Sequence, residues 1–328
     1  MLGQESGPRQ GVPSAGVTRA RPPRPALLLV ANPRATATSS RLAAEVAREL
    51  AVAWTVELVE TEAGGHATAL TRDGVGRGCD AVAALGGDGT ANEVINGLAG
   101  SDVPFACFAG GATNVLCRML GSGGPPARAA RRLAELPRGR RRRRIDLGEL
   151  NGRRFAASAG VGVDASVARW AAQRRRPCAP LRHWHYTYGA LRTFLRSYVA
   201  EPPAMELRSG GRRLPGVSAF VQNGPHYTFF GARPIDLVTG GSFDDGALAG
   251  AVLRRAEAVD VPGIVTRALC PGARVGAHRH VDVFAGARHA TLVSTDGRKL
   301  PLAVDGDFVT EAAAVRLSVL PRALALVA

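Results

Sequence analysis

The chain has 328 residues, 46% of them hydrophobic, and a net charge of +15. This length allows two medium domains, and the hydrophobic content is sufficient for two cores. No apolar run approaches the roughly 20 residues that cross a bilayer, so no transmembrane segment is predicted and the expected location is the cytoplasm. The 5 cysteines are scattered and include no CxxC pair, which indicates neither a disulfide framework nor a zinc site.

The positive charge comes from arginine, since Lys299 is the only lysine. A Walker-type phosphate loop and a protein-kinase site both need lysine at a set position, so phosphoryl chemistry here would depend on backbone N–H groups, metal and arginine. Eight arginines lie in residues 131–144 and seven in residues 165–200. These clusters are either solvated surface or a contact for an anionic partner. They lack interleaved aromatic residues beside a recognised module, so no nucleic-acid partner is expected.

Residues 1–25 are rich in Gly, Pro and polar residues and predict a disordered tail. Strands and helices then alternate through residues 26–152. Strands are expected near 26–31, 53–60, 81–85, 104–108 and 142–147, with helices near 39–50, 66–75, 91–99, 114–120 and 125–136. This alternation predicts a Rossmann-like α/β domain, in which helices cover a parallel sheet and ligand groups gather at the carboxyl ends of the strands.

Residues 153–328 have a different texture, with short β-rich runs separated by Gly and Pro. They predict an antiparallel β-rich domain, and its last residues could return to the first domain. Residues 181–199 interrupt it with a helical pattern whose apolar stripe comprises Trp184, Tyr188, Leu191, Leu195 and Tyr198. This helix either packs on the β-domain or places its aromatic face and arginines on an anionic bilayer.

The most informative segment is Gly86, Gly87, Asp88, Gly89, Thr90, which follows the apolar run 81–85 and precedes a helical pattern. Glycines let the backbone approach a phosphate, and the N–H groups of a helix N-terminus attract anions. An acid in such a turn would repel phosphate unless a cation lay between them. The segment therefore indicates a magnesium-linked nucleotide site, although alone it could be only a tight turn.

The longer string GGDGTANEVINGL, with GGATN at residues 110–114 and Asn-Pro at residues 32–33, resembles the bacterial diacylglycerol kinase catalytic-domain family, a group of lipid kinases. The resemblance runs from about residue 26 to the end of the chain. It implies an ATP site formed by these same segments. The implied ATP-site residues are Asn32, Thr61, Gly86, Gly87, Asp88, Gly89, Thr90, Asn92, Glu93, Thr113 and Asn114.

Acidic residues supply the candidates for metal binding and proton transfer. Asp88 is the first candidate ligand for Mg²⁺ and Asp146 the second. The resemblance also links Asp244 and Asp245 to a structural Mg²⁺, and it makes the final acid of Asp-Gly-Asp 305–307 the catalytic base. The family has Glu where this chain has Asp307, so the backbone must come closer for Asp307 to serve. Other departures from the family pattern are Ala109, Ala112 and Val115.

The sequence thus predicts an ATP- and Mg²⁺-dependent kinase that phosphorylates a lipid hydroxyl, with diacylglycerol as the expected acceptor and phosphatidic acid as the product. The enzyme would dock peripherally on an anionic membrane surface. Assembly into a homodimer is an alternative to a monomer that the sequence leaves open. An NAD-kinase-like enzyme and a non-catalytic nucleotide- or lipid-binding homologue are the alternatives. The 7 histidines, His278 and His280 among them, show no HxxxH or HExxH spacing and are expected to be ordinary surface or core residues.

Overall fold

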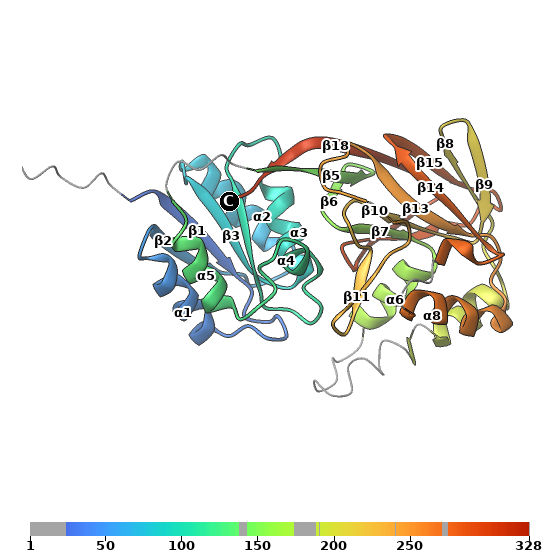
Figure 1. Cartoon of the computed structure of the whole chain (residues 1–328), viewed down its shortest axis with the longest axis horizontal. Coiled ribbons are helices and arrows are strands. Elements are labelled where there is room, and N and C mark those ends of the chain that lie inside the picture. Colours follow the sequence, from blue (N-terminus) through green and yellow to red (C-terminus); the bar gives the residue numbers. More distant parts are fainter. Residues whose placement is uncertain are drawn as a thin grey trace, which may run out of the picture.

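A computed structural model describes residues 24–137, 143–173, 188–189, 191–239, 241–270 and 275–327. Two lobes lie side by side, an α/β lobe built from the first part of the chain and a β-rich lobe built from the rest (Figure 1). Nearly all of the predicted tail 1–25 lies outside the described residues. Within the described part of the chain, no helix is long and apolar enough to cross a membrane.

The α/β lobe contains one parallel sheet with the strand order β2-β1-β3-β4. Its strands are β1 (Ala26–Ala31), β2 (Thr55–Glu60), β3 (Ala81–Gly86) and β4 (Phe105–Ala109). Its helices are α1 (Ser40–Leu50), α2 (His66–Gly76), α3 (Asp88–Gly97), α4 (Val115–Met119) and α5 (Pro126–Ala134). Residues 81–86 and 105–109 are buried throughout, as expected for strands covered on both faces. The predicted Rossmann-like lobe is confirmed.

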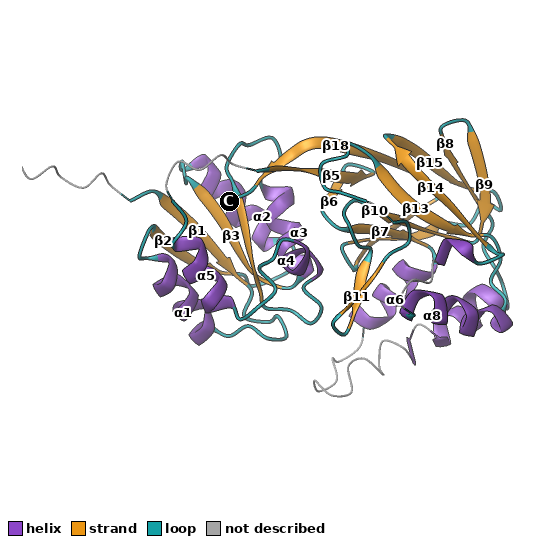
Figure 2. Ribbon diagram, in the orientation of Figure 1, coloured by secondary structure: helices purple, strands orange, loops and turns teal. Residues whose placement is uncertain are grey.

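Two hydrophobic cores flank this sheet, because successive strand residues point to opposite faces. Leu28, Val30 and Val82 pack with residues of α2 and α3, whereas Leu27, Leu29 and Ala83 pack with residues of α1 and α5. Figure 2 shows these helices in purple around the orange strands. The sheet carries its loops at the carboxyl ends of β1 and β3, where the strand order reverses and ligands of such folds bind.

The β-rich lobe contains two six-stranded sheets and one hairpin. The first sheet has the order β14-β13-β10-β7-β16-β17, the second β6-β5-β18-β15-β8-β9, and the hairpin is β11-β12. The strands are β5 (Arg144–Leu150), β6 (Arg153–Phe155), β7 (Ser158–Val161), β8 (Met205–Ser209), β9 (Arg212–Gly216), β10 (Ser218–Gln222), β11 (Thr228–Phe230), β12 (Arg233–Ile235), β13 (Leu248–Leu253), β14 (Val281–Ala287), β15 (His289–Ser294), β16 (Leu300–Val304), β17 (Asp307–Ala312) and β18 (Ala314–Ala325). Their pairing is antiparallel, as predicted.

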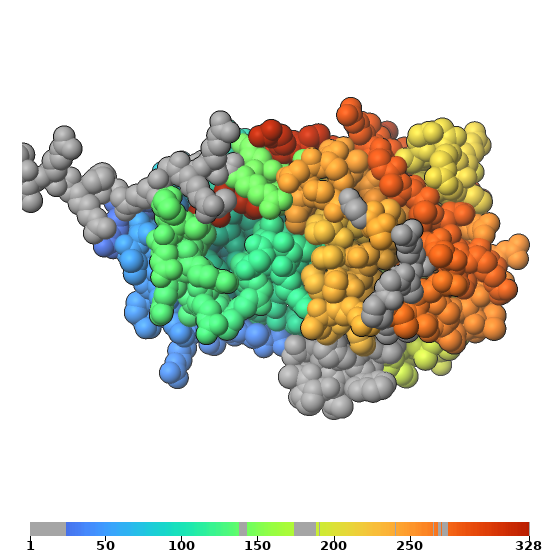
Figure 3. Space-filling view, in the orientation of Figure 1, coloured from blue at the N-terminus to red at the C-terminus, as the bar shows by residue number. Residues whose placement is uncertain are grey.

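Two segments of the chain do not follow a simple division into two consecutive domains. The strand predicted near 142–147 as part of the parallel sheet is β5, which pairs antiparallel with β6 and β18 instead. At the other end, the N–H of Val327 donates to the carbonyl of Phe105 on β4. The red C-terminal strand consequently lies along the top of the molecule between the lobes in Figure 3. A domain boundary at residue 152 stays a prediction.

Two helices of the β-rich lobe are absent from the sequence prediction. They are α6 (Val163–Ala172), which follows β7, and α8 (Val261–Leu269), which lies between β13 and β14. Both are short helices between strands, and their apolar residues do not form a long periodic stripe. The first of them matters for the site, because α6 faces the α/β lobe's loops across a cleft.

The predicted helix 181–199 is described at residues 188–189 and 191–199, and Trp184 lies outside the described residues. The predicted single stripe is wrong, because Tyr198 is only 3% exposed and shares a hydrogen bond with Ser166. Tyr188, Leu191 and Leu195 are instead 61%, 45% and 40% exposed. The helix thus packs on the lobe through Tyr198, and the Tyr188 ring also lies edge-on to Trp170 with 6.3 Å between ring centroids, while Tyr188, Leu191 and Leu195 keep an exposed face. Arg174, Arg175 and Arg176 lie outside the described residues.

Candidate active site

Two glycine-rich loops pack against each other at the carboxyl ends of β3 and β4. The N–H of Gly110 donates to the carbonyl of Gly86 at 2.8 Å. A β-carbon on Gly110 would lie 3.0 Å from the Gly86 α-carbon, and one on Gly111 would lie 2.4 Å from the Gly87 α-carbon. Side chains at these positions would push the loops apart. The glycines are therefore needed so that the two loops can pack against each other. The sequence prediction had explained these glycines only by the close approach of a phosphate.

Helix α3 begins inside the GGDGT segment, at Asp88, and not at residue 91 as predicted. Asp88, Gly89 and Thr90 form its first turn, whose N–H groups have no acceptor within the helix. These three residues line a cleft. The predicted anion-binding helix N-terminus is thus part of the glycine loop itself.

The Asp88 carboxylate lies between the N-termini of two helices. It occupies the first turn of α3, and its Oδ1 accepts the N–H of Leu116 in α4 at 3.1 Å. Burial raises the pKa of Asp88 to about 6; the N–H groups of Val115 and Leu116 lower it, and the negative charges of Asp305 and Asp307 raise it further. A cation beside Asp88 would favour its ionised form.

The cleft has a volume of about 400 Å³ and lies between the two lobes. The α/β lobe lines it with Asn32, Thr61, Gly87, Asp88, Gly89, Thr90, Glu93 and Thr113, all of which were predicted for the ATP site. The β-rich lobe adds α6 and the turn between β16 and β17. Predicted ATP-site residues that lie far apart in the sequence are therefore brought together at one edge of the parallel sheet.

Asp307 reaches this cleft from the β-rich lobe. A β-carbon placed on Gly89 would lie 1.9 Å from Asp307 Oδ2, so the carboxylate rests on the first turn of α3. The contact brings the predicted base to the predicted nucleotide loop. It also gives Gly89 a reason to lack a side chain.

Asp305 holds the turn that presents Asp307. Its carboxylate accepts the N–H groups of Ala156, Ala157 and Ser158 at 2.8 to 3.1 Å. Asn92 of α3 donates to the same carboxylate at 2.8 Å. Burial raises the pKa of Asp305, while these four donors oppose the rise. Asp305 thus links the β-rich lobe to α3, a role that the Asp-Gly turn signal in the sequence could not reveal.

Several predicted nucleotide residues are occupied with internal hydrogen bonds. Asn92 is 1% exposed and does not line the cleft, since its amide joins Asp305 and the carbonyl of Arg154. The Glu93 carboxylate accepts the N–H groups of Gly65 and Ala67 at 2.8 and 3.1 Å, which caps α2. Asn114 closes its own loop by accepting the N–H of Gly111 at 2.7 Å. These contacts shape the loops, and ATP contacts by these residues stay predictions.

The four predicted metal ligands lie in two places. Asp88 lines the cleft, whereas Asp146 is 2% exposed and does not. Asp146 accepts the N–H of Gly246, at the end of the Asp244-Asp245 turn, and the N–H of Arg322 on β18, both at 2.7 Å. Asp244 lies 3.0 Å from the guanidinium of Arg143. Asp146 therefore fixes the Asp-Asp-Gly turn to the C-terminal strand.

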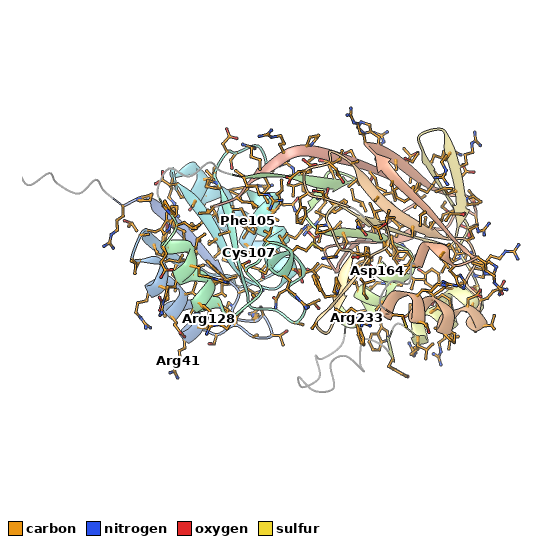
Figure 4. All side chains as sticks on the ribbon, viewed as in Figure 1. Arg41, Phe105, Cys107, Arg128, Asp164 and Arg233 are labelled. Carbon is orange, nitrogen blue, oxygen red and sulfur yellow. The ribbon has the colours of Figure 1, made fainter. Side chains whose placement is uncertain are left out.

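Two further residues of the cleft were not predicted for the site. Arg34, two residues after Asn32, is the arginine among the described lining residues. Asp164 of α6, labelled in Figure 4, accepts the hydroxyl of Tyr227 at 2.7 Å, and burial raises the pKa of its carboxyl although this hydrogen bond opposes the rise. Asp164 lies in the first turn of α6, a helix that the sequence prediction did not include.

The charges that line the cleft fit a magnesium–nucleotide complex better than a bare nucleotide. Its carboxylates are Glu62, Asp88, Glu93, Asp164, Asp305 and Asp307, against the single described guanidinium of Arg34. A polyphosphate would meet mainly negative groups, and a divalent cation held by Asp88 would offset this repulsion. One or two carboxylates plus phosphate oxygens form the usual Mg²⁺ site of phosphotransferases.

Comparison with known proteins shows which family the α/β lobe resembles. Residues 26–150 match the family model of the diacylglycerol kinase catalytic domain, which confirms the resemblance predicted from the glycine motif. The chain is 32% identical over 146 residues to "Probable lipid kinase YegS-like" of Pseudomonas fluorescens, covering 44% of this chain and 46% of that protein. It is 36% identical over 104 residues to "Diacylglycerol kinase" of Bacillus subtilis, covering 31% and 33%. The matches thus span less than half of either relative.

Solved structures extend the likeness to the whole fold. A structure described as a diacylglycerol kinase from Bacillus anthracis str. Sterne has a TM-score of 0.66 and 18% identity, with 92% of this chain and 96% of that chain covered. Another from the same organism reaches a TM-score of 0.70 at 20% identity. At these identities the likeness shows the two-lobed fold alone.

Proposed function

We propose that this protein transfers the γ-phosphoryl group of ATP to a lipid hydroxyl, with diacylglycerol as acceptor and phosphatidic acid as product. The observation that carries the proposal is the contact between Asp307 and Gly89, which brings a carboxylate of the β-rich lobe onto the first turn of α3. The family match of residues 26–150 supports kinase chemistry. The second lobe supplies what that segment lacks, a base on the acceptor side.

Each residue of the cleft has a distinct part in this proposal. The N–H groups of the α3 first turn and the guanidinium of Arg34 would bind the phosphates of ATP. Asp88 would hold Mg²⁺, which when bound would neutralise charge on the β- and γ-phosphates. Asp307 would accept the proton of the lipid hydroxyl. The hydroxyl oxygen then bonds to the γ-phosphorus, the bond to the bridging oxygen breaks, and ADP leaves.

The Asp307 side chain can serve as the base although it is shorter than Glu, because its carboxylate reaches the first turn of α3. The sequence prediction required such an approach, since Asp is one methylene shorter than the Glu of the family pattern. The predicted approach agrees with the Asp307 carboxylate resting on the Gly89 α-carbon.

A lipid acceptor requires the protein to reach a membrane surface, and we include docking in the proposal. Tyr188, Leu191 and Leu195 present an exposed apolar face beside Arg192 and Arg196. Apolar side chains next to arginines suit an anionic bilayer, where each basic residue contributes about 1 kcal/mol. The net charge of +15 favours the same surface.

Transfer of radiolabelled phosphate from ATP tests the proposed activity. The purified protein would be incubated with Mg²⁺ and a panel of lipids in mixed micelles, and NAD would be included as a competing acceptor. Labelled phosphatidic acid is the expected product. Label on NAD would favour the NAD-kinase alternative, and nucleotide binding without any transfer would favour a non-catalytic homologue.

A further inference from the structure

A second group of polar side chains lies in the β-rich lobe, away from the cleft, where β13 meets β14. The antiparallel pairing sets Leu253 opposite Val281, and the N–H of Arg254 donates to the carbonyl of His280 at 2.8 Å. This pairing places the turn after β13, residues 254–260, beside residues 278–280. Residues that are far apart along the chain are thereby brought together at the start of α8.

Three of these side chains have their metal-binding atoms in one place. The donor atoms of Glu257, Asp260 and His280 all lie within 4.8 Å of one another. His280 Nδ1 and Asp260 Oδ2 share a hydrogen bond of 2.6 Å, which fixes the imidazole beside the carboxylate. Asp260 is 5% exposed, so its carboxylate is placed by the fold and not by solvent.

His278 lies next to this group and faces both His280 and Asp260. Its Nδ1 accepts the N–H of His280 at 3.3 Å, which leaves the proton of a neutral ring on Nε2. Nε2 faces Asp260 Oδ1 at 3.6 Å. An imidazole N–H directed at a carboxylate is the arrangement that commonly positions a metal ligand from outside the coordination sphere.

Arginines surround the group, since Arg254, Arg255 and Arg279 line the same cavity as Glu257 and His280. Arg279 pairs with Asp260 at 3.0 Å, but its side chain is 65% exposed and can turn to solvent. Within the described part of the chain, the Glu257 carboxylate makes no hydrogen bond although it is half-buried beside Asp260. Two carboxylates held together with one imidazole form a donor set for a divalent ion.

We propose that Glu257, Asp260 and His280 form a binding site for Zn²⁺ that is separate from the proposed magnesium–nucleotide site. The imidazole donor favours Zn²⁺ over Mg²⁺, which prefers oxygen ligands alone. The three protein ligands leave one coordination position, and Glu257 and His280 both line a cavity of about 940 Å³ into which that position can open. The ion would fasten α8 to the start of β14.

Zinc titration of the metal-stripped full-length protein in excess Mg²⁺ tests this site, with a chromophoric chelator as the competitor and the unfolding temperature as a second readout. We expect one bound Zn²⁺ and a raised unfolding temperature. Glu257→Gln and His280→Ala should each weaken Zn²⁺ binding by roughly tenfold or more. His289→Ala, which changes an exposed histidine outside the group, and Cys270→Ser, which removes an exposed thiol near α8, should bind like the parent.

Glu257→Gln is the decisive variant, because loss of a half-buried carboxylate without a hydrogen-bond partner should leave the fold intact, as circular dichroism would check. Equal Zn²⁺ affinity in the parent, Glu257→Gln and His280→Ala would overturn the proposal. So would the absence of Zn²⁺ binding to the parent, since the group would then be an ion-pair network centred on Asp260. Transfer activity plays no part in this test, so its result is independent of the proposed kinase function.

Discussion

The Asp307 carboxylate lies directly against the α-carbon of Gly89, so that a β-carbon at residue 89 would stand 1.9 Å from Asp307 Oδ2. Asp307 is the first residue of β17, and Gly89 lies in the first turn of α3. Asp305 fixes the spacing through its hydrogen bonds to both lobes. The two lobes therefore share one cleft, and changes on either side of the contact should alter catalysis in different ways.

Gly89→Ala should reduce the turnover number by roughly 100-fold, because the new methyl group displaces the Asp307 carboxylate from the loop. The unfolding temperature should change little, since an exposed carboxylate can rotate away. Steady-state kinetics and thermal unfolding would measure both effects. Gly76→Ala in α2 is the matched control, because a β-carbon there meets no atom within 4 Å. Normal turnover in Gly89→Ala would show that Asp307 is not needed at this position.

Asp88→Asn should lower the rate of phosphoryl transfer by two or more decades, since it removes the charge proposed to hold Mg²⁺ at the α3 first turn. The fold should persist, because an amide oxygen can still accept the N–H of Leu116. Kinetic assays paired with circular dichroism would check this. Wild-type turnover in this variant would contradict the assignment.

The same variant should change the pH dependence of stability. The pKa of Asp88 is about 6 in the folded protein against an ordinary value of 3.8, so the parent's unfolded chain loses this proton first as pH rises. The stability that protonated Asp88 contributes is full below about pH 4 and is lost as pH rises through about 6. Above pH 7, metal-free Asp88→Asn should therefore be more stable than the parent by about 1 to 3 kcal/mol. Urea unfolding at pH 4 and pH 8 would show the difference only at pH 8.

Asp307→Asn should abolish transfer yet leave ATP affinity within a few-fold of the parent, because the base acts on the acceptor hydroxyl. Asp307→Glu restores the acid of the family pattern and should remain active. Equilibrium binding of ATP and transfer rates on micellar diacylglycerol would separate the two functions. Full activity of Asp307→Asn would place the base elsewhere and leave Asp-Gly-Asp as a turn only.

Asp305→Ala should destabilise the protein by about 3 kcal/mol or more, because it strands the buried N–H groups of Ala156, Ala157 and Ser158 and frees the Asn92 amide. Asp102→Ala, which removes an exposed partner of Arg144, should cost less than about 1 kcal/mol. Urea denaturation of both variants would compare them. A similar small loss in both would deny Asp305 its role between the lobes.

Leu191→Ser with Leu195→Ser should weaken sedimentation with anionic vesicles and spare turnover of a short-chain soluble acceptor. Their side chains are 45% and 40% exposed, so the fold should tolerate the change. Val52→Ser is a matched control on the α/β lobe, where Val52 is 64% exposed. Binding of the parent should also fall with salt, since arginines contribute to docking. Vesicle binding that ignores both the double change and salt would place docking elsewhere.

Local patterns in the sequence were sufficient for most elements of the α/β lobe, and most of the residues predicted for the ATP site line the cleft. Buried apolar runs predicted β1, β3 and β4 within about a residue, because a strand covered on both faces needs continuous hydrophobic side chains. The polar residues after those runs had to meet, since parallel strands end at one edge. Asn32, Thr61 and Asp88 follow such runs, and the family resemblance assigned the same residues to the ATP site.

Only the tertiary structure could decide which of those residues face the cleft and which hold the fold. Asn92 and Glu93 follow the motif as closely as Thr90, yet Asn92 is buried against Asp305 away from the cleft, whereas Glu93 lines the cleft and caps α2 with the same carboxylate. Tertiary structure also decided the pairing of β5. Its sequence predicts a fifth parallel strand, but the strand pairs antiparallel with β18. The physical reason is that hydrogen-bond partners such as Asp305 and Asn92 lie far apart in the chain. Their pairing is determined by how the two lobes pack, which no local spacing encodes.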